Sequence, residues 1–359
     1  MSRFERKNLA GMQGYSWGEQ PHDTDTIKLN TNENPYPPSP TVQQALAAVD
    51  VARLRTYPPP TADALRAALA THHGLTQDNV VMTHGGDEGL RLAITTYVET
   101  DGAFGMATPS YSLYPVLAGV HGARVVDVPL QQDWRLPDDT AQRLNRENVT
   151  LTCLVNPHAP SGLLTPLADL ARLAQELHGV LLIDEAYADF VDPALHYDSA
   201  PLLEHHDNVL ILRTFSKGYS LAGLRLGYLL GHAELIAPII GKTRDSYNID
   251  FLSQRLGLAS VSDQPYASET WSKVRQARHD LRSALADLGL QAPVSEANFL
   301  LASVPPDAAR SAAQLYAALK ERGILVRYFD SDRLRDKLRI TIGTPAENQR
   351  LLEALTQLL

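Results

Sequence analysis

The sequence predicts an α/β protein with a large, doubly wound, mostly parallel sheet domain and a smaller α+β unit. Between about residue 79 and residue 212, short apolar runs alternate with amphipathic helical segments, which is typical of a parallel sheet with helices on both faces. After about residue 250, a long charged helical segment and further short elements replace this alternation. The length of 359 residues is enough for one large domain and one smaller domain.

The elements follow in order from the N-terminus. Residues 1 to about 35 are expected to form an irregular arm or lid with a short strand over residues 26–29. A helix is expected from about Thr41, then a stiff Tyr-Pro-Pro-Pro connector at residues 57–60, with Thr61 as the N-cap of the next helix. Strands are predicted over residues 80–82, 103–107, 123–128, 150–155, 180–183 and 209–212. Helices are predicted over residues 87–98 and 111–120, and after Thr165, which would cap a helix with Pro166 at its first position.

The C-terminal part of the chain predicts a smaller α+β unit. A long amphipathic helix is expected from about Gln264 to a stop at Gly289. It is followed by a strand over residues 298–304, a helix ending at Gly323, strands over residues 324–327 and 338–342, and a last helix from Pro345.

Composition excludes several classes of protein. The formal net charge of −9 and the lack of a basic run argue against nucleic acid or an anionic membrane as a partner, because both require basic patches. No segment approaches the roughly 20 apolar residues of a membrane span, and the N-terminus has no apolar signal region. The single cysteine, Cys153, lies in an apolar run and predicts a buried thiol with no disulfide within the chain. These features predict a cytoplasmic protein.

A lysine in a turn after an apolar strand is the first candidate for chemistry. Lys217 follows the strand at residues 209–212, at the edge of an α/β sheet where ligands bind. A lysine amine is a nucleophile towards aldehydes, and Thr214, Ser216 and Arg225 are residue types that hold phosphate. This combination suggests pyridoxal phosphate. On this stretch alone, a solvated Ser-Lys loop fits the sequence equally well.

Two other strand ends carry candidate ligands. Residues 85–89 (Gly-Gly-Asp-Glu-Gly) follow a strand and open a helix, which predicts an anion site, although a plain strand-to-helix turn also fits; the segment is neither GxGxxG nor a Walker loop. Asp184 and Tyr187 follow a buried strand, where an acid can hold a pyridine nitrogen protonated and a phenol can bind the ring hydroxyl. Asn156 would supply a second donor to that ring oxygen. His158 is expected in a surface loop and has no assigned role.

Taken together, these segments resemble the fold-type I aminotransferases over nearly the full chain. The resemblance rests on the order of Gly85-Gly86-Asp87, Tyr111, Asn156-Pro157, Asp184 with Tyr187, Ser216-Lys217 and Arg225. Within that family, the histidinol-phosphate aminotransferases are the most similar group, through residues 29–35, 57–58, 86–89, 222–225 and 338–344. One departure stands at residue 159, where this chain has Ala159 in place of the family's usual asparagine.

The resemblance implies a role for each candidate residue. Lys217 would bond to pyridoxal 5'-phosphate and shuttle a proton, Asp184 would pair with the pyridinium, and Asn156 and Tyr187 would hold the ring hydroxyl. Tyr111 would stack on the ring. The cofactor phosphate would lie on Gly86, Asp87, Ser216 and Arg225, with Thr214 nearby and Tyr57 arriving from the second subunit of a homodimer. Tyr15, Asn32, Arg327 and Arg339 would bind the substrate, and no metal site is implied.

The resemblance also implies a domain division and a reaction. The large cofactor domain would span residues 46–254, and the small domain would be built from both chain ends, residues 1–45 and 255–359. The reaction would convert imidazole acetol phosphate and glutamate to histidinol phosphate and 2-oxoglutarate in histidine biosynthesis. Two alternatives with the same cofactor are an aromatic aminotransferase and a threonine-phosphate decarboxylase. A non-catalytic effector-binding module is a third alternative, disfavoured because every chemical position is filled.

Overall fold

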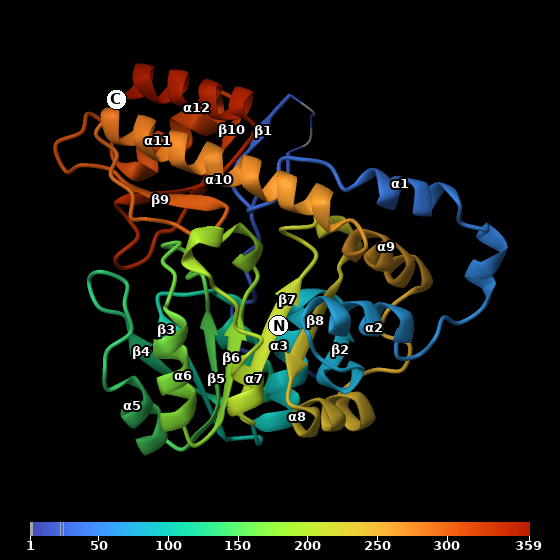
Figure 1. The fold of residues 1–359 in the computed structure, drawn as a ribbon. Helices are drawn as coiled ribbons and strands as arrows, with labels where there is room; N and C mark the ends of the chain where they lie inside the picture. Colours follow the sequence, from blue (N-terminus) through green and yellow to red (C-terminus); the bar gives the residue numbers. More distant parts are fainter. Residues whose placement is uncertain (1–2, 22, 24) are drawn as a thin grey trace.

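A seven-stranded sheet forms the centre of the computed structural model, which describes residues 3–21, 23 and 25–359 (Figure 1). The strands lie in the order β2-β8-β7-β6-β5-β3-β4. Strand β8 runs opposite to the other six strands of this sheet, so the sheet is mixed but mostly parallel, and the predicted α/β fold class is confirmed. A three-stranded antiparallel sheet, β11-β12-β9, and a parallel pair, β1-β10, lie apart from the large sheet, beside the C-terminal helices α11 and α12 (Figure 1).

The elements have the following bounds. The strands are β1 Ile27–Lys28, β2 Val80–Thr83, β3 Ala103–Thr108, β4 Arg124–Pro129, β5 Val149–Val155, β6 Val180–Asp184, β7 Val209–Thr214, β8 Gly227–Gly231, β9 Phe299–Ser303, β10 Ile324–Leu325, β11 Arg327–Tyr328 and β12 Lys337–Thr341. The helices are α1 Pro40–Ala47, α2 Asp63–His72, α3 Gly85–Tyr97, α4 Leu113–His121, α5 Thr140–Arg146, α6 Leu167–Glu176, α7 Leu202–His205, α8 Ala233–Pro238, α9 Phe251–Val261, α10 Gln264–Asp287, α11 Ala312–Glu321 and α12 Pro345–Leu358.

Alternating apolar side chains explain why both faces of the large sheet are covered. In β6, Leu182 packs in one core cluster, which includes residues of α3 and α4, and its neighbours Leu181 and Ile183 pack in a second cluster with residues of α2, α5 and α6. In β7, Leu210 packs in the first cluster and its neighbour Ile211 packs in the second. Because successive side chains of a strand point to opposite faces, a continuous apolar run places core residues on both sides of the sheet.

Two predicted helix caps are wrong. Helix α2 begins after Ala62, not Thr61, because the Thr61 hydroxyl donates to the Asp63 carboxylate (2.6 Å) instead of accepting from the helix. Helix α6 begins at Leu167, and Pro166 is its extended N-cap with no side-chain cap bond. The backbone N–H of Thr165 donates to the Asn156 side chain (2.7 Å), which holds this residue outside the helix.

The N-terminal segment joins the C-terminal part of the chain. Strand β1 pairs in parallel with β10, with Ile27 opposite Ile324, although the two strands are far apart in the sequence (Figure 1). Helix α10 is the long helix that crosses above the large sheet towards α11 and α12. The boundaries at residues 46 and 254 stay a prediction, and residues 1, 2, 22 and 24 of the predicted small domain lie outside the described residues.

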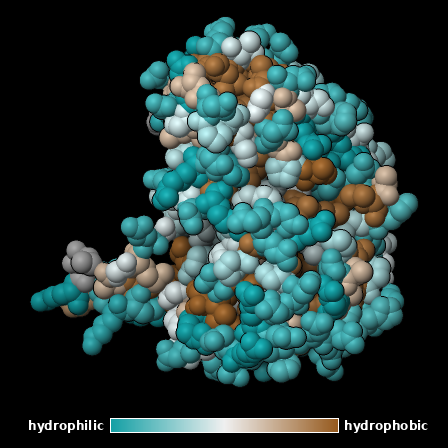
Figure 2. Space-filling model, turned by 90° about the vertical axis from the view of Figure 1, so that its left-hand side faces the viewer, coloured by the Kyte–Doolittle hydropathy of each residue, from teal (hydrophilic) through white to brown (hydrophobic). Residues whose placement is uncertain are grey.

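The surface shows no continuous apolar band on the face drawn in Figure 2, where hydrophobic residues form separate patches among hydrophilic ones. Within residues 3–21, 23 and 25–359, no helix is long and apolar enough to cross a bilayer. Cys153 is buried in β5, as expected.

Candidate active site

A cavity of about 300 Å³ lies where β2, β3, β5, β6 and β7 end. These five strands run in the same direction, so their carboxyl ends meet at one edge of the sheet, which is where open α/β sheets bind ligands. The predicted site residues on the cavity wall are Tyr15, Asn32, Gly86, Asp87, Tyr111, Asp184, Tyr187, Thr214, Ser216, Lys217, Arg225, Arg327 and Arg339. The fold therefore brings together most of the residues that the sequence singled out.

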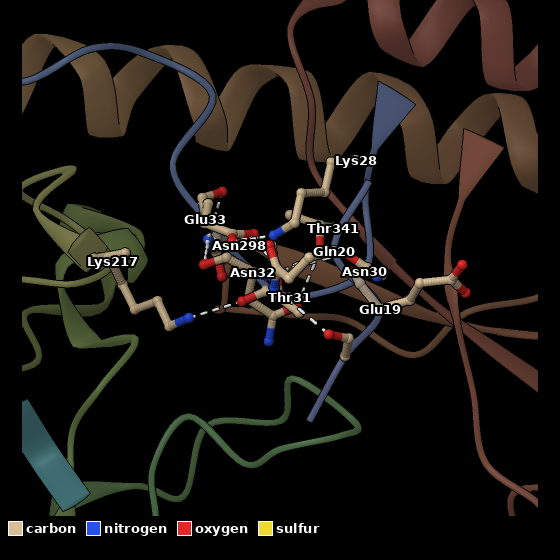
Figure 3. A network of polar contacts seen from close by, with 12 residues as sticks. Glu19, Gln20, Lys28, Asn30, Thr31, Asn32, Glu33, Lys217, Asn298 and Thr341 are labelled. Carbon is tan, nitrogen blue, oxygen red and sulfur yellow. Dashed lines mark hydrogen bonds and ion pairs between the residues drawn. The ribbon is translucent and has the colours of Figure 1, made fainter. Parts of the chain in front are cut away.

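Lys217 presents a half-buried amine to the cavity. Its Nζ donates to the backbone carbonyl of Thr31 (2.8 Å) on the N-terminal arm (Figure 3). Burial lowers the pKa of Lys217 to about 8, and the nearby Glu33 carboxylate opposes this shift. A larger fraction of the amine is therefore neutral near pH 7 than in an exposed lysine, and the neutral amine is the nucleophilic form.

Asp184 ends β6 as a buried carboxylate. Tyr114, which is fully buried, donates to Asp184 Oδ2 (2.7 Å), and the Ala186 backbone N–H donates to Oδ1 (3.1 Å). Burial raises the pKa of Asp184 to about 6, although the Tyr114 hydrogen bond lowers it. A carboxylate that is costly to ionise in isolation is well suited to a cationic partner, because that partner would offset the cost.

An anion site surrounds the first turn of α3. The helix begins at Gly85, so its first backbone N–H groups are free for an anion. Arg225 Nη1 donates to the Ser216 hydroxyl (3.3 Å) and Nη2 donates to Asp87 Oδ2 (3.3 Å), which places the guanidinium beside the helix start. Gly85 has a positive φ of 74°, which favours glycine, and a Cβ there would lie 2.8 Å from Arg225 Nη2 and displace this side chain. Thr214 Oγ1 accepts from the Ser216 N–H (3.1 Å) and holds the turn.

Two arginines form a second cationic region on the wall. Arg327 of β11 and Arg339 of β12 are opposite each other in the antiparallel ladder. Like charges directly opposite each other are destabilising unless an anion lies between them or nearby. The buried Nε of Arg339 has no hydrogen-bond partner among the residues that the structure describes, and its Nη2 donates to the Asn30 carbonyl (2.9 Å). This pair therefore has unused donors for a carboxylate or a phosphate.

Aromatic side chains complete the wall. Tyr111 meets Tyr15 edge-on at 5.6 Å between ring centroids and Tyr114 at 5.5 Å, which holds its ring in one orientation. The hydroxyl of Tyr187 accepts from Asn32 Nδ2 (3.0 Å). Asn32, predicted to bind substrate, lines the cavity. Its side-chain amide N–H donates to the Tyr187 hydroxyl and so orients that phenol.

Asn156 is placed differently from the prediction. Its Nδ2 donates to the Tyr197 hydroxyl oxygen (2.8 Å) and to the Thr165 carbonyl (3.2 Å), so both amide hydrogens are taken, and it is not on the cavity wall. The structure does not support its predicted contact with the ring hydroxyl. Ala159, the departure from the family pattern, lies on the wall instead, and a methyl group there can donate no hydrogen bond.

Tyr57 is also away from this cavity. Its side chain is 80% exposed and stacks on Tyr247 at 4.5 Å between ring centroids. Its predicted contact with a neighbour's site is not tested by a single chain and stays a prediction.

Sequence reasoning also missed several residues. His158 is buried, not in a surface loop, because its ring nitrogens bond the Ser161 hydroxyl (2.7 Å) and the Pro109 carbonyl (2.9 Å). Tyr114 in the first turn of α4 was overlooked, because its contacts with Tyr111 and Asp184 depend on tertiary structure. Lys28 and Glu33 of the arm were overlooked because their contacts depend on tertiary structure.

A protein-family model described as aminotransferase class I and II matches residues 24–355. The chain belongs to the class I and II aminotransferase family. Its relatives in this aminotransferase family include proteins named histidinol-phosphate aminotransferase 1 from Nostoc sp., 40% identical over 100% of this chain and 99% of the relative, and histidinol-phosphate aminotransferase from Geotalea daltonii, 40% identical over 98% and 99%. The crystal structure of the Sinorhizobium meliloti histidinol-phosphate aminotransferase in complex with pyridoxal-5'-phosphate is also similar. It has a TM-score of 0.84 and 27% identity, over 93% of this chain and 92% of that one.

The buried Asp184 of this aminotransferase predicts a pH-dependent stability. Because its pKa is raised in the fold, its stabilising contribution is fully present below the ordinary pKa of 3.8 and is lost as the pH rises through about 6. In the protein without added ligand, Asp184→Asn removes this titration and keeps the shape. As the pH rises from about 4 to about 7, the unfolding free energy of the parent should fall relative to that of the variant by about 3 kcal/mol.

The measurement is urea unfolding of both proteins across that pH range. In Tyr114→Phe, the loss of stability that accompanies ionisation of Asp184 should occur at a higher pH than in the parent, because the tyrosine hydrogen bond favours the ionised carboxylate. A stability difference between Asp184→Asn and the parent that does not change with pH would contradict this account.

Proposed function

We propose that this aminotransferase is a histidinol-phosphate aminotransferase of histidine biosynthesis that uses pyridoxal 5'-phosphate. One observation carries the proposal: a single cavity holds an amine of lowered pKa, a buried carboxylate, and two separate cationic regions for anions. A phosphorylated cofactor needs one anion region, and an anionic substrate needs the other. The full-length relatives that carry this name at 40% identity support it.

The residues present fit the cofactor. The start of α3 with Ser216 and Arg225 would hold its phosphate, and Asp184 would hold the positive charge of its ring nitrogen. Tyr187, oriented by Asn32, would bond the ring hydroxyl. When bound, pyridoxal phosphate supplies an electron-withdrawing ring that stabilises negative charge at the substrate α-carbon.

Lys217 would move the proton in this reaction. Its free amine would be the general base that removes a proton from the substrate α-carbon and the acid that later gives that proton back. A pKa of about 8 suits this role, because a base of that strength can both accept and release a proton near neutral pH. The Tyr111 and Tyr15 rings would exclude water from one part of the cavity.

The two substrates would share the arginine pair. Glutamate brings an α-carboxylate, whereas histidinol phosphate has none and brings a phosphate. Arg339 Cζ lies 5.4 Å from the ring centroid of Phe299 and 5.5 Å from that of Phe329, and its guanidinium fork matches either anion. Arg327, whose Nη2 donates to the Ser16 carbonyl (3.0 Å), would add contacts for the doubly charged phosphate.

We also propose a homodimer. Large apolar side chains are exposed over residues 46–57: Leu46 51%, Val51 73%, Leu54 52% and Tyr57 80%. Exposed apolar residues gathered in one segment are typical of a contact surface. The domain division at residues 46 and 254 and a cytoplasmic location complete the proposal.

Covalent labelling tests the function. Incubation with pyridoxal phosphate and reduction with borohydride should place the label on Lys217 by peptide mapping, and Lys217→Ala should remove it. In half-reactions followed by absorbance, histidinol phosphate should react faster than phenylalanine or threonine phosphate. A label on another lysine contradicts the cofactor site, a preference for phenylalanine indicates an aromatic aminotransferase, and release of CO₂ from threonine phosphate indicates a decarboxylase.

The shared anion site predicts the effect of Arg339→Lys. The change keeps the charge and removes the fork, so kcat/KM should fall about 10-fold or more for both glutamate and histidinol phosphate, as expected for one lost charge-assisted hydrogen bond. Arg327→Ala should impair histidinol phosphate more than glutamate. Steady-state kinetics with each substrate measure both effects. Unchanged half-reactions in Arg339→Lys would show that another group binds the anion.

The dimer predicts recovery of activity on mixing. A Lys217→Ala chain and a chain disabled at Tyr57 should regain part of the activity when they are dissociated and reassociated together, because one of the mixed sites has both residues intact. Each variant reassociated alone is the control. Heterodimers verified by mass spectrometry that recover no activity would count against a site shared between subunits.

A further inference from the structure

The N-terminal arm contacts several site residues at once. We use the term arm segment for residues 28–34, which run past the cavity between β1 and α1 (Figure 3). Three consecutive carbonyls of this segment accept hydrogen bonds: Asn30 from Arg339 (2.9 Å), Thr31 from Lys217 (2.8 Å) and Asn32 from Asn298 (3.0 Å). The position of the Thr31 carbonyl therefore decides where the free amine of Lys217 lies.

A cluster of three side chains holds this peptide in place. Lys28 Nζ contacts both the Thr31 hydroxyl and the Glu33 carboxylate, and the Thr31 hydroxyl donates to Glu33 (Figure 3). Asn32, between Thr31 and Glu33, has a positive φ of 58°, so the chain turns sharply at this point. The Asn32 N–H donates to the Thr341 hydroxyl (3.0 Å), which fixes the other side of the turn.

The cluster has no function in the site as described above. Lys28 and Glu33 are not on the cavity wall, and their side chains are 21% and 38% exposed. Both side chains are therefore partly buried. The position of this pair beside the Thr31 carbonyl that receives Lys217 is what distinguishes it from other surface pairs.

Lys28 and Glu33 have opposite effects on the protonation of the Lys217 amine. Glu33 favours the charged amine, whereas Lys28, Arg225 and Arg339 disfavour it. The other titratable groups on the same cavity wall are Tyr15, Asp87, Tyr111, Asp184, Tyr187 and Arg327.

We propose that Lys28, Thr31 and Glu33 form a positioning unit that holds the free amine of Lys217 against the Thr31 carbonyl whenever the lysine is not bonded to the cofactor. This inference rests on the proposed function, in which Lys217 alternates between a covalent bond and a free amine. The unit keeps the amine at the cavity wall, where Thr31 lies, while the side chains of Lys28 and Glu33 stay off that wall. Glu33 stabilises the protonated form that the amine reaches after it takes a proton, and Lys28 limits that effect.

The test measures the free amine of Lys217 directly, in cofactor-free protein. Acetylation with a low dose of acetic anhydride at a series of pH values, followed by mass spectrometry of the Lys217 peptide, gives the pH of half-maximal reactivity. In Glu33→Gln this midpoint should fall by about half a pH unit, because a nearby negative charge is lost. In Lys28→Met it should rise by a similar amount, and in the double variant it should return towards the parent value.

A matched control removes a different lysine–glutamate pair. Glu269 contacts Lys273 on the exposed side of α10 (2.6 Å), so Glu269→Gln has the same chemistry away from the cavity and should leave the Lys217 midpoint unchanged. Thermal melting shows whether each variant is folded. If Lys28→Met does not fold, the shift in Glu33→Gln relative to Glu269→Gln decides alone.

Midpoints that stay at the parent value in Glu33→Gln, or that move in the same direction in Glu33→Gln and Lys28→Met, overturn the inference. The measurement needs no cofactor, so its failure is distinct from failure of the proposed function. If pyridoxal phosphate labels Lys217 but the midpoints do not respond, the function stands and the positioning unit does not. If the midpoints shift as expected but no cofactor binds, the arm still positions the lysine and the proposed reaction is wrong.

Discussion

A buried carboxylate at the end of β6 sets the main electrostatic constraint in this molecule. Asp184 has little contact with water, and the two hydrogen bonds that it accepts do not fully replace lost solvation, so its pKa is raised. The carboxylate stays buried because its surroundings are rigid: Tyr114 is fully buried, and β6 is a central strand paired on both sides. A site with this property stabilises a bound cation, and the rest of the cavity supplies the groups that would orient the molecule that carries it.

The large sheet could be predicted from the sequence because its signals are local. Each central strand is an apolar run whose neighbouring side chains enter opposite core clusters, and the predicted runs at residues 180–183 and 209–212 correspond to β6 and β7. Since parallel strands end at one edge, the sequence pattern alone places Asp184 and Lys217 at the same edge of the sheet. The caps at Thr61 and Thr165 failed because each residue has a competing partner, Asp63 and Asn156 respectively.

Contacts within the site could be predicted less well, because side-chain direction in turns depends on neighbours far away in the chain. Asn156 follows a strand as expected, yet its amide is drawn to Tyr197, and the position on the wall goes to Ala159. The facing of Arg327 and Arg339 depends on the register between β11 and β12, which the sequence does not encode in any local pattern. The cluster of Lys28, Thr31 and Glu33 gains its meaning only from the approach of Lys217.

The pairing of β1 with β10 has a consequence for the order of events during synthesis on the ribosome. The strands of the large sheet all precede residue 232, so that sheet can form while the chain is still being made. The partners of the arm, including β10, Arg339 and Thr341, emerge about 300 residues after the arm itself. The nascent chain therefore contains the arm, the lysine and the carboxylate before it contains the C-terminal segment that holds the arm in place. Acquisition of a complete site is one of the last events of biogenesis, and truncated translation products would carry an open and unfinished pocket.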